Sequence, residues 1–263
     1  MTNTALAPPL PARPFNPTPT VVLAAIVLAA LCVRGLDISP ETLAYAGADI
    51  VEYFGRYTQP DFADLGRYLR LLLETLATAV WGTAFAFVGG VLLAPLAARN
   101  LSPHPLAYRL ARELLALSRA LPDLLLALVF VAALGLGPLP GALALGVHTV
   151  GFLGKFFAES LERVPEGTYE ALRATGAGPV QVLCYAGWPS IAREMAGYVC
   201  YIFDRNVRMG SVLGLVGAGG IGLALADTIK LFDYGRSAAL ILVLLAAILA
   251  IDALSGWVRR RLH

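Results

Sequence analysis

The chain has few charged residues. Asp, Glu, Lys and Arg make up 14% of its 263 residues, against roughly 25% in an ordinary soluble domain. Its net charge is only +2, and its basic residues form no single stripe, which argues against nucleic acid as a partner. The low charge, with 58% hydrophobic residues and a mean hydropathy of +0.71, predicts an all-α, polytopic membrane protein embedded in the lipid bilayer.

The sequence also lacks the motifs of several enzyme classes. It contains no G-x-x-x-x-G-K-[ST] nucleotide-binding loop, no H-E-x-x-H zinc motif and no G-x-S-x-G nucleophile elbow. Its three cysteines have no metal-ligand spacing. We therefore expect no catalytic residue, no metal site and no cofactor bound by this chain.

Apolar runs of about 20 residues are long enough to cross a membrane as helices. Six candidate spans follow, at residues 19–36, 72–97, 120–136, 139–157, 191–213 and 237–257. Gly135, Gly137 and Pro138 break the run between the third and fourth spans, which predicts a tight turn there. Proline-rich residues 1–18 are expected to form a flexible tail.

The distribution of arginine predicts the orientation. Arginines gather between the second and third spans, around the polar segment after the fourth span and at the end of the chain, which are positions 99, 109, 112, 119, 163, 173, 193 and 259–261. In a six-span protein of the plasma (inner) membrane these segments share the cytoplasmic side, and both termini are cytoplasmic. Residues 19–69 then hold the first span and an acidic extracytoplasmic loop, 70–258 form the core, and 259–263 are a basic tail.

A polar segment, residues 159–189, interrupts the apolar runs. Glu166 and Glu170 favour the first half of a short helix through its dipole, and Gly176 can end that helix in a left-handed conformation. Pro179 suits the start of a second short helix, which Gly187 and Pro189 would stop. The segment therefore predicts a helical hairpin that projects from the membrane.

Glu170, Ala171 and Gly176, with Pro189 thirteen residues further on, resemble the EAA loop of ABC importer permeases. The strings PLAARN (95–100), SRALPDLLLALVFVAALGLGPLPGALALGVHTVGFLGKFFAE (118–159) and YIFDRNVRMGSVLGLVGAGGIG (201–222) look like the membrane subunit of phosphonate-type importers. This resemblance implies a type I importer permease fold and a transport component that is not an enzyme. The residues expected to couple it to an ATPase are Glu166, Glu170, Ala171, Thr175, Gly176 and Pro189.

The resemblance also implies partners. They are a cytoplasmic ATPase dimer that holds ATP and Mg, a second permease copy or a paralogue, and an extracytoplasmic binding protein. That protein would deliver phosphonate, phosphite, phosphate or a related oxyanion. An ion-coupled secondary transporter of a small anion is the alternative, but no internal repeat and few in-span carboxylates support it.

Charged residues inside a span usually have a function. Asp204, Asn206 and Arg208 lie in the fifth span, where a guanidinium could contact a passing oxyanion. Equally, Asp204 and Arg208 are four residues apart and could form an ion pair that fixes helix packing. Both interpretations remain open.

The glycine run after the fifth span matches G-x-G-x-x-G, but no βαβ unit surrounds it, so a dinucleotide site is rejected. Gly217, Gly219 and Gly220 instead predict a sharp turn or close helix packing in the transport path, or a plain extracytoplasmic turn. Residues 221–230 would follow as a short partial helix or gate.

Other ionisable residues are predicted to have structural roles. Two pairs with i, i+4 spacing are expected to form ion pairs, namely Arg119 with Asp123 and Lys155 with Glu159. The lone His148 on an apolar helix is expected to be packed and hydrogen-bonded. Glu74 is expected to act as a cap or interface residue at the outer end of the second span.

Overall fold

The computed structural model describes residues 18–35 and 40–262, in two units that divide after Gly55. The first unit contains α1 (Thr18–Gly35) and α2 (Pro40–Gly55). Helix α1 coincides with the first predicted span. Part of the predicted acidic loop is helical, because α2 lies within it. Of the predicted N-terminal tail, residues 1–17 lie outside the described residues.

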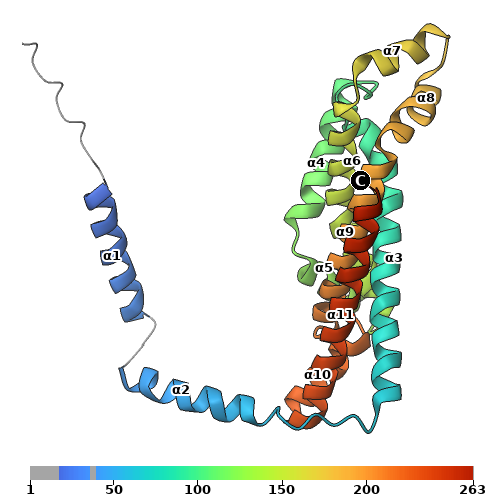
Figure 1. Ribbon diagram of the computed structural model, residues 1–263. Helices are drawn as coiled ribbons and strands as arrows, with labels where there is room; N and C mark the ends of the chain where they lie inside the picture. Colours follow the sequence, from blue (N-terminus) through green and yellow to red (C-terminus); the bar gives the residue numbers. More distant parts are fainter. Residues whose placement is uncertain (1–17, 36–39, 263) are drawn as a thin grey trace, which may run out of the picture. The chain divides into compact units, whose positions relative to one another are not determined.

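The second unit is built around two long helices that pack against each other, α3 (Leu65–Ala97) and α6 (Pro138–Arg163) (Figure 1). Glycines permit their close approach. A Cβ on Gly82 would lie 2.7 Å from the Cβ of Leu145, and one on Gly146 would lie 2.9 Å from the Cβ of Phe85. Lipid is as apolar as the side chains, so helices in a membrane associate through close van der Waals packing. Small residues at the helix contacts permit that close packing.

The third predicted span, residues 120–136, contains a sharp bend. Helix α4 (Pro105–Ala120) and helix α5 (Asp123–Leu134) meet at 87°. Pro122 causes this break, because it disfavours a helical conformation at Leu121, whose φ and ψ are −77° and 122°. The span is therefore a 12-residue helix joined to a bent neighbour, and not one straight helix.

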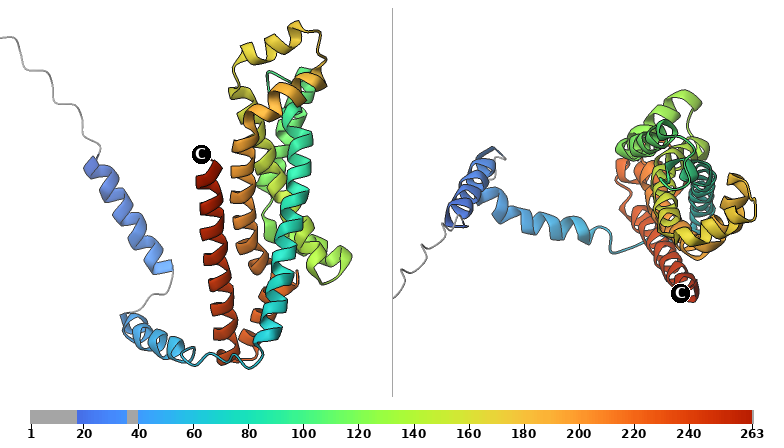
Figure 2. Two further views of the ribbon diagram at one scale, coloured as in Figure 1. Left: turned by 45° about the vertical axis from the view of Figure 1, so that its right-hand side comes forward. Right: turned by 90° about the horizontal axis from the view of Figure 1, so that it is seen from above.

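The remaining helices lie at the two ends and along the side of the unit. They are α7 (Glu166–Ala174), α8 (Pro179–Val182), the π-helical turn η1 (Leu183–Gly187), α9 (Trp188–Gly214), α10 (Gly220–Lys230) and α11 (Tyr234–Leu262). Helices α7 and α8 form a hairpin at one end of the unit, and α10 lies at the other (Figures 1 and 2). We call residues 166–187 the α7–α8 hairpin.

Three helices are long and apolar enough to cross a membrane, namely α3, α6 and α11, and the bent pair α4–α5 would add a fourth if it forms one span. Helix α9 is also long, but charged residues interrupt its apolar sequence. Residues 18–35 and 40–262 form helices and no strand, which confirms the all-α class. The count of six spans stays a prediction, although each predicted interval contains a helix.

Helix α11 extends into the predicted basic tail, residues 259–263. Helix α11 runs through Arg259, Arg260 and Arg261 to Leu262, so these arginines form its last turn. Cations at the C-terminal end of a helix are stabilised by the helix dipole, which explains why the helix continues through them. His263 lies outside the described residues.

One buried apolar cluster fixes the α7–α8 hairpin to the rest of the unit. Phe157 and Leu161 from α6 are fully buried in it, together with Tyr169 from α7, and Val182 from α8 is nearly so. The hairpin is therefore not a free loop, because each of its helices contributes a buried side chain to the same cluster.

Candidate functional site

The α7–α8 hairpin has the geometry that its sequence predicts. Helix α7 begins at Glu166, directly after Pro165, and Gly176 follows its end with a φ of +84°. Helix α8 begins at Pro179, and the side chain of Gln181 accepts a hydrogen bond of 2.8 Å from the backbone N–H of Gly178. A left-handed residue ends one helix and a proline opens the next, so the chain reverses within a few residues.

Pro189 does not stop the second helix, contrary to the prediction. The chain passes from α8 through the π-helical turn η1 into α9, and Pro189 lies in the first turn of α9. A proline is tolerated in a first turn, where its missing N–H would have no helical partner in any case. Gly187 is likewise helical, with φ −62°. The second helix of the hairpin is therefore rigidly continuous with the fifth predicted span.

The outer surface of the hairpin carries the predicted coupling residues. Glu166, Glu170, Ala171, Thr175 and Gly176 are all exposed. Beside them, Val180 and Tyr185 expose 72% and 74% of their surface. A groove of about 370 Å³ runs between the two helices, lined by Leu172, Thr175, Gly176, Ala177, Gln181 and Tyr185. The hairpin thus presents apolar side chains and a groove within a charged surface.

Tyr169 anchors the hairpin, and the sequence interpretation missed it. Its side chain is fully buried, and its hydroxyl donates a hydrogen bond of 2.9 Å to the carbonyl oxygen of Leu161. Burial, with a smaller effect from the Glu166 carboxylate, raises the pKa of Tyr169, which keeps the hydroxyl protonated as a donor. An aromatic residue next to Glu170 in a short polar helix was the available signal.

The base of the hairpin is tied to α3 and α4 through Glu162. Its carboxylate accepts hydrogen bonds from the backbone N–H of Arg99 at 2.7 Å and from the guanidinium of Arg112 at 2.9 Å. Asn100 donates to the carbonyl oxygen of Leu161 at 3.1 Å, beside the Tyr169 bond. A displacement of α7 therefore acts on α6 and, through Glu162, on the ends of α3 and α4.

In α9, the ion pair between Asp204 and Arg208 is present. Asp204 is buried, whereas the Arg208 side chain is 46% exposed. Asn206 is fully buried and donates a hydrogen bond of 3.0 Å to the hydroxyl of Thr83 in α3. Of the three predicted path residues in α9, Arg208 alone therefore presents a substantially accessible polar side chain.

Asp123 pairs with a different arginine from the one predicted. Its carboxylate lies 3.8 Å from the guanidinium of Arg205 in α9, which also lies 3.0 Å from Nε2 of His148. The predicted pair of Asp123 with Arg119 is wrong, because the 87° bend after α4 removes the helical spacing of the two residues. His148 is packed and hydrogen-bonded as predicted, with Nδ1 2.9 Å from the carbonyl oxygen of Leu121 at this bend.

The glycine run forms both a sharp turn and a close helix contact. Gly217, Gly219 and Gly220 have φ values of +97°, +78° and +69°. A Cβ on Gly222 would lie 1.9 Å from the carbonyl oxygen of Ser211, so no larger residue fits between α9 and α10. These two features explain why glycine is required along this run.

Residues of α3 cap the helix that follows this turn. The Glu74 carboxylate accepts a hydrogen bond of 3.0 Å from the N–H of Gly220, and the Thr75 hydroxyl accepts one of 2.9 Å from the N–H of Ile221. The prediction that Glu74 is a cap or interface residue is confirmed. A carboxylate at a helix N-terminus is stabilised by the dipole, so α10 is held to α3.

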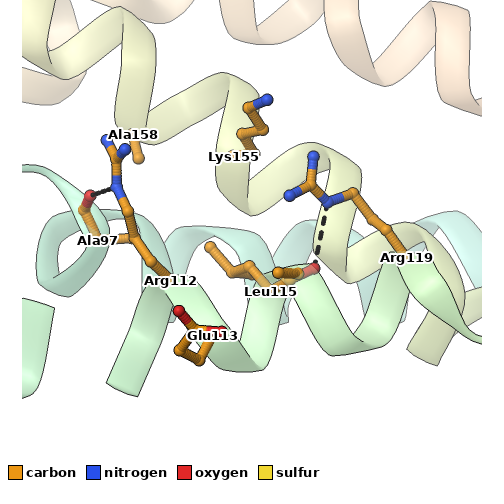
Figure 3. Close-up of a pocket in the computed structure, with 8 residues that line it drawn as sticks. Ala97, Arg112, Glu113, Leu115, Arg119, Lys155 and Ala158 are labelled. Carbon is orange, nitrogen blue, oxygen red and sulfur yellow. Dashed lines mark hydrogen bonds between the residues drawn. The ribbon is translucent and has the colours of Figure 1, made fainter. Parts of the chain in front are cut away.

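Lys155 and Glu159 form the predicted ion pair, at 3.5 Å. Lys155 also lines a cavity of about 240 Å³ between α4 and α6, together with Ala97, Arg112, Glu113, Leu115, Ala116, Arg119 and Ala158 (Figure 3). In the part of the chain that the structure describes, no group of three or more His, Cys, Asp or Glu residues is arranged to hold a metal ion.

The chain is similar to known transporter subunits. It is 42% identical over 240 residues to the phosphite transport system permease protein PtxC of Stutzerimonas stutzeri. The matched region covers 91% of this chain and 86% of that protein. It is also 42% identical over 225 residues to the phosphate-import permease protein PhnE of Mycolicibacterium smegmatis, over 86% of this chain and 42% of that protein.

Among solved structures, a chain of the methionine ABC transporter MetNI, in inward-facing conformations, is similar in fold. The TM-score is 0.63 at 21% identity, over 74% of this chain and 95% of that chain. This similarity confirms the fold of a type I ABC importer permease. A family model described as binding-protein-dependent transport system inner membrane component matches residues 86–263. The chain therefore belongs to the family of inner membrane components of binding-protein-dependent transport systems.

Proposed function

We propose that this chain is the permease subunit of an ATP-driven importer for phosphite, phosphonate, phosphate or a related phosphorus oxyanion. The observation that carries the proposal is the 42% identity to a phosphite permease over 91% of the chain. The family match over residues 86–263 includes both the α7–α8 hairpin and the charged part of α9. As a permease the chain is a transport component and not an enzyme, and ATP hydrolysis belongs to a separate subunit.

In this proposal the α7–α8 hairpin docks onto the ATPase. Its exposed Val180 and Tyr185 offer apolar contact area, Thr175 and Gly176 line the groove, and Glu170 is exposed on the same hairpin. Closure of an ATPase dimer that holds ATP and Mg would push on this surface. The force would then reach α6 through Tyr169 and α9 through the continuous helix at η1.

Transport also needs a path through the membrane that handles negative charge. The Arg208 guanidinium provides donors that match a tetrahedral oxyanion, and its pairing with Asp204 lowers the cost of holding a cation there without an anion. The turn at Gly217, Gly219 and Gly220, held by α3, would form the outer part of this path. Weak contacts suit this role, because a tightly bound anion would not be released.

Orientation and partners follow from the same proposal. The α7–α8 hairpin lies on the cytoplasmic side with both termini, and the chain is a multi-pass protein of the inner membrane. An extracytoplasmic binding protein delivers the oxyanion at the opposite side. A second permease subunit, either an identical copy or a paralogue, completes the channel.

Reconstitution tests the proposed function. The chain would be purified together with a candidate ATPase and a candidate binding protein and placed in vesicles that contain ATP. We expect uptake of radiolabelled phosphite or phosphate that requires both ATP and the binding protein. Uptake that follows an ion gradient without ATP would instead support a secondary transporter, and ATP-driven uptake restricted to substrates without phosphorus would contradict the substrate class.

A further inference from the structure

Within residues 18–35 and 40–262, no carboxylate forms an ion pair with Arg119 of α4. The bend at Pro122 separates it from Asp123, which lies instead beside Arg205. Its Nε–H donates to the carbonyl oxygen of Leu115 at 3.2 Å. The two terminal amino groups of the guanidinium are therefore left to bind another acceptor. A half-buried cation that lacks a counter-ion favours an anionic ligand.

Two further cations line the same cavity as Arg119. Figure 3 shows Arg112 and Arg119 on the side of α4 that faces α6, the helix that carries Lys155; Glu113 also lines the cavity, but its side chain points away from these arginines. Arg112 and Lys155 have carboxylate partners, Glu162 at 2.9 Å and Glu159 at 3.5 Å. The cavity therefore combines two compensated cations with one uncompensated cation, and its volume of about 240 Å³ leaves room for a small oxyanion.

Phe152 connects this cavity to the charged segment of α9. The guanidinium carbon of Arg119 lies 5.9 Å from the centre of the Phe152 ring, and that of Arg205 lies 5.1 Å from the same centre. Arg208 follows Arg205 by about one helical turn. The Phe152 ring thus contacts both Arg119 of the cavity and Arg205 of α9, and Arg208 lies further along α9 toward the glycine turn; we refer to arginines 208, 205 and 119 as this series.

The ion pairs along this series leave some hydrogen-bonding atoms unused. Arg205 and Asp123 are 3.8 Å apart, which is too long for a hydrogen bond. Oδ2 of Asp123, Nη1 of Arg205 and Oδ1 of Asp204 are buried, and the structure gives them no hydrogen-bond partner. The unpartnered Nη1 of Arg205 can donate to a passing oxyanion while Asp123 stays beside the same guanidinium, so no buried carboxylate has to lose its partner.

We propose that Arg119, with Arg112 and Lys155, forms an oxyanion-binding site on the α4–α6 side of the transport path, which the substrate reaches from Arg208 by way of Arg205. This inference rests on the proposed function, because it takes the substrate to be a phosphorus oxyanion. The absence of a carboxylate partner makes Arg119 the position where the anion rests. The neighbouring ion pairs keep the site weak enough to release it.

A charge-removing substitution tests this site. In the complete transporter, Arg119→Gln should lower the initial rate of phosphite uptake about tenfold or more, the effect of one lost charge-assisted hydrogen bond. Arg109→Gln is the matched control, because Arg109 is exposed on the same helix and does not line the cavity. Co-purification with the ATPase verifies assembly of both variants. Equal uptake by the two variants would overturn the proposal.

Chemical restoration of the charge separates binding from packing. Arg119→Cys would be made in a chain whose Cys32, Cys184 and Cys200 are replaced by serine. Modification with a cationic aminoethyl methanethiosulfonate should restore uptake several-fold, whereas the neutral hydroxyethyl reagent of similar size should not. Equal responses to both reagents would assign Arg119 a packing role and overturn the proposal.

The two proposals fail in distinguishable ways. If the unmodified transporter moves no phosphorus oxyanion in vesicles, the proposed function fails, and the site at Arg119 fails with it. If the unmodified transporter imports phosphite and Arg119→Gln imports it equally fast, the proposed function stands and only the site is wrong.

Discussion

The α7–α8 hairpin and helix α9 carry the same kinds of charged side chains in opposite surroundings. In the hairpin, Glu166 and Arg173 pair at 2.9 Å with 53% and 45% of their side chains exposed. In α9, Asp204 pairs with Arg208, but its side chain is only 5% exposed. The comparison teaches that charge has two uses here. At the hairpin charge keeps the surface proposed for docking in water, whereas in α9 it is a buried group that requires a partner.

The largest expected effect comes from the turn of the hairpin. Gly176→Pro is incompatible with a φ of +84° and removes the hydrogen bond of 2.9 Å from the N–H of Gly176 to the carbonyl oxygen of Arg173. The native turn should lose about 3 kcal/mol or more, and uptake should fall at least tenfold while the chain still enters the membrane. Uptake and ATPase co-purification are the measurements.

Gly167→Ala is the control for this variant, because Gly167 is helical and a Cβ there meets nothing within 4 Å. It should preserve uptake, since alanine favours a helix by up to about 1 kcal/mol over glycine. Normal uptake and normal ATPase binding by Gly176→Pro would remove the hairpin from the coupling mechanism.

Asp204→Asn should have the next largest effect, on stability as well as on uptake. It leaves Arg208 without its counter-ion and places a neutral amide in a buried position. The expected loss is about 1–3 kcal/mol, below the value for a fully buried pair because Arg208 is half-exposed. Thermal unfolding in detergent measures it. A melting temperature equal to that of the unmodified chain would show that burial in α9 does not require the pair.

Tyr169→Phe should have a smaller effect, confined to coupling. The variant keeps the buried ring but loses the hydrogen bond to Leu161, at a cost of about 1 kcal/mol. We expect fewer oxyanions transported per ATP hydrolysed, because α7 is held less firmly to α6. Tyr201→Phe is the control, since Tyr201 is an exposed tyrosine of α9 outside the hairpin. An unchanged ratio of transport to hydrolysis in Tyr169→Phe would contradict the anchoring role.

The smallest effect is expected at the exposed ion pair of the hairpin. Glu166→Gln should change the free energy of unfolding by less than about 1 kcal/mol, and added salt should reduce the difference further. Chemical unfolding at low and high salt measures this. A loss as large as that of Asp204→Asn would mean that the hairpin charges are not solvated as the structure indicates.

Local patterns predicted the features that depend on a few neighbouring residues. The hairpin helices, the left-handed Gly176 and the Lys155–Glu159 pair all arise within one or two helical turns, and the structure confirms them. The pair of Arg119 with Asp123 was wrong because Pro122 ends the helix between them. The same kind of local argument failed at Pro189, which a first helical turn accommodates.

Contacts between residues far apart in the chain could not be predicted from the sequence. The hydrogen bond from Tyr169 to Leu161 spans eight residues across a helix end, and the contact of Arg205 with Asp123 joins α9 to α5. Glu74 was expected to cap or to lie at an interface, but its partner, the N–H of Gly220, is 146 residues away. No periodicity of a single helix encodes such a pairing, because it depends on how helices pack.

The sequence by itself determined the class of this protein: a helical membrane permease with a polar helical hairpin, because low charge, apolar runs and glycine and proline positions act locally. Only the tertiary structure decided which charges meet. Whether an arginine in a buried segment is neutralised depends on the carboxylates that other helices bring to it. That packing pairs Arg208 with Asp204, brings Arg205 to Asp123 and, among the described residues, leaves Arg119 without an ion pair.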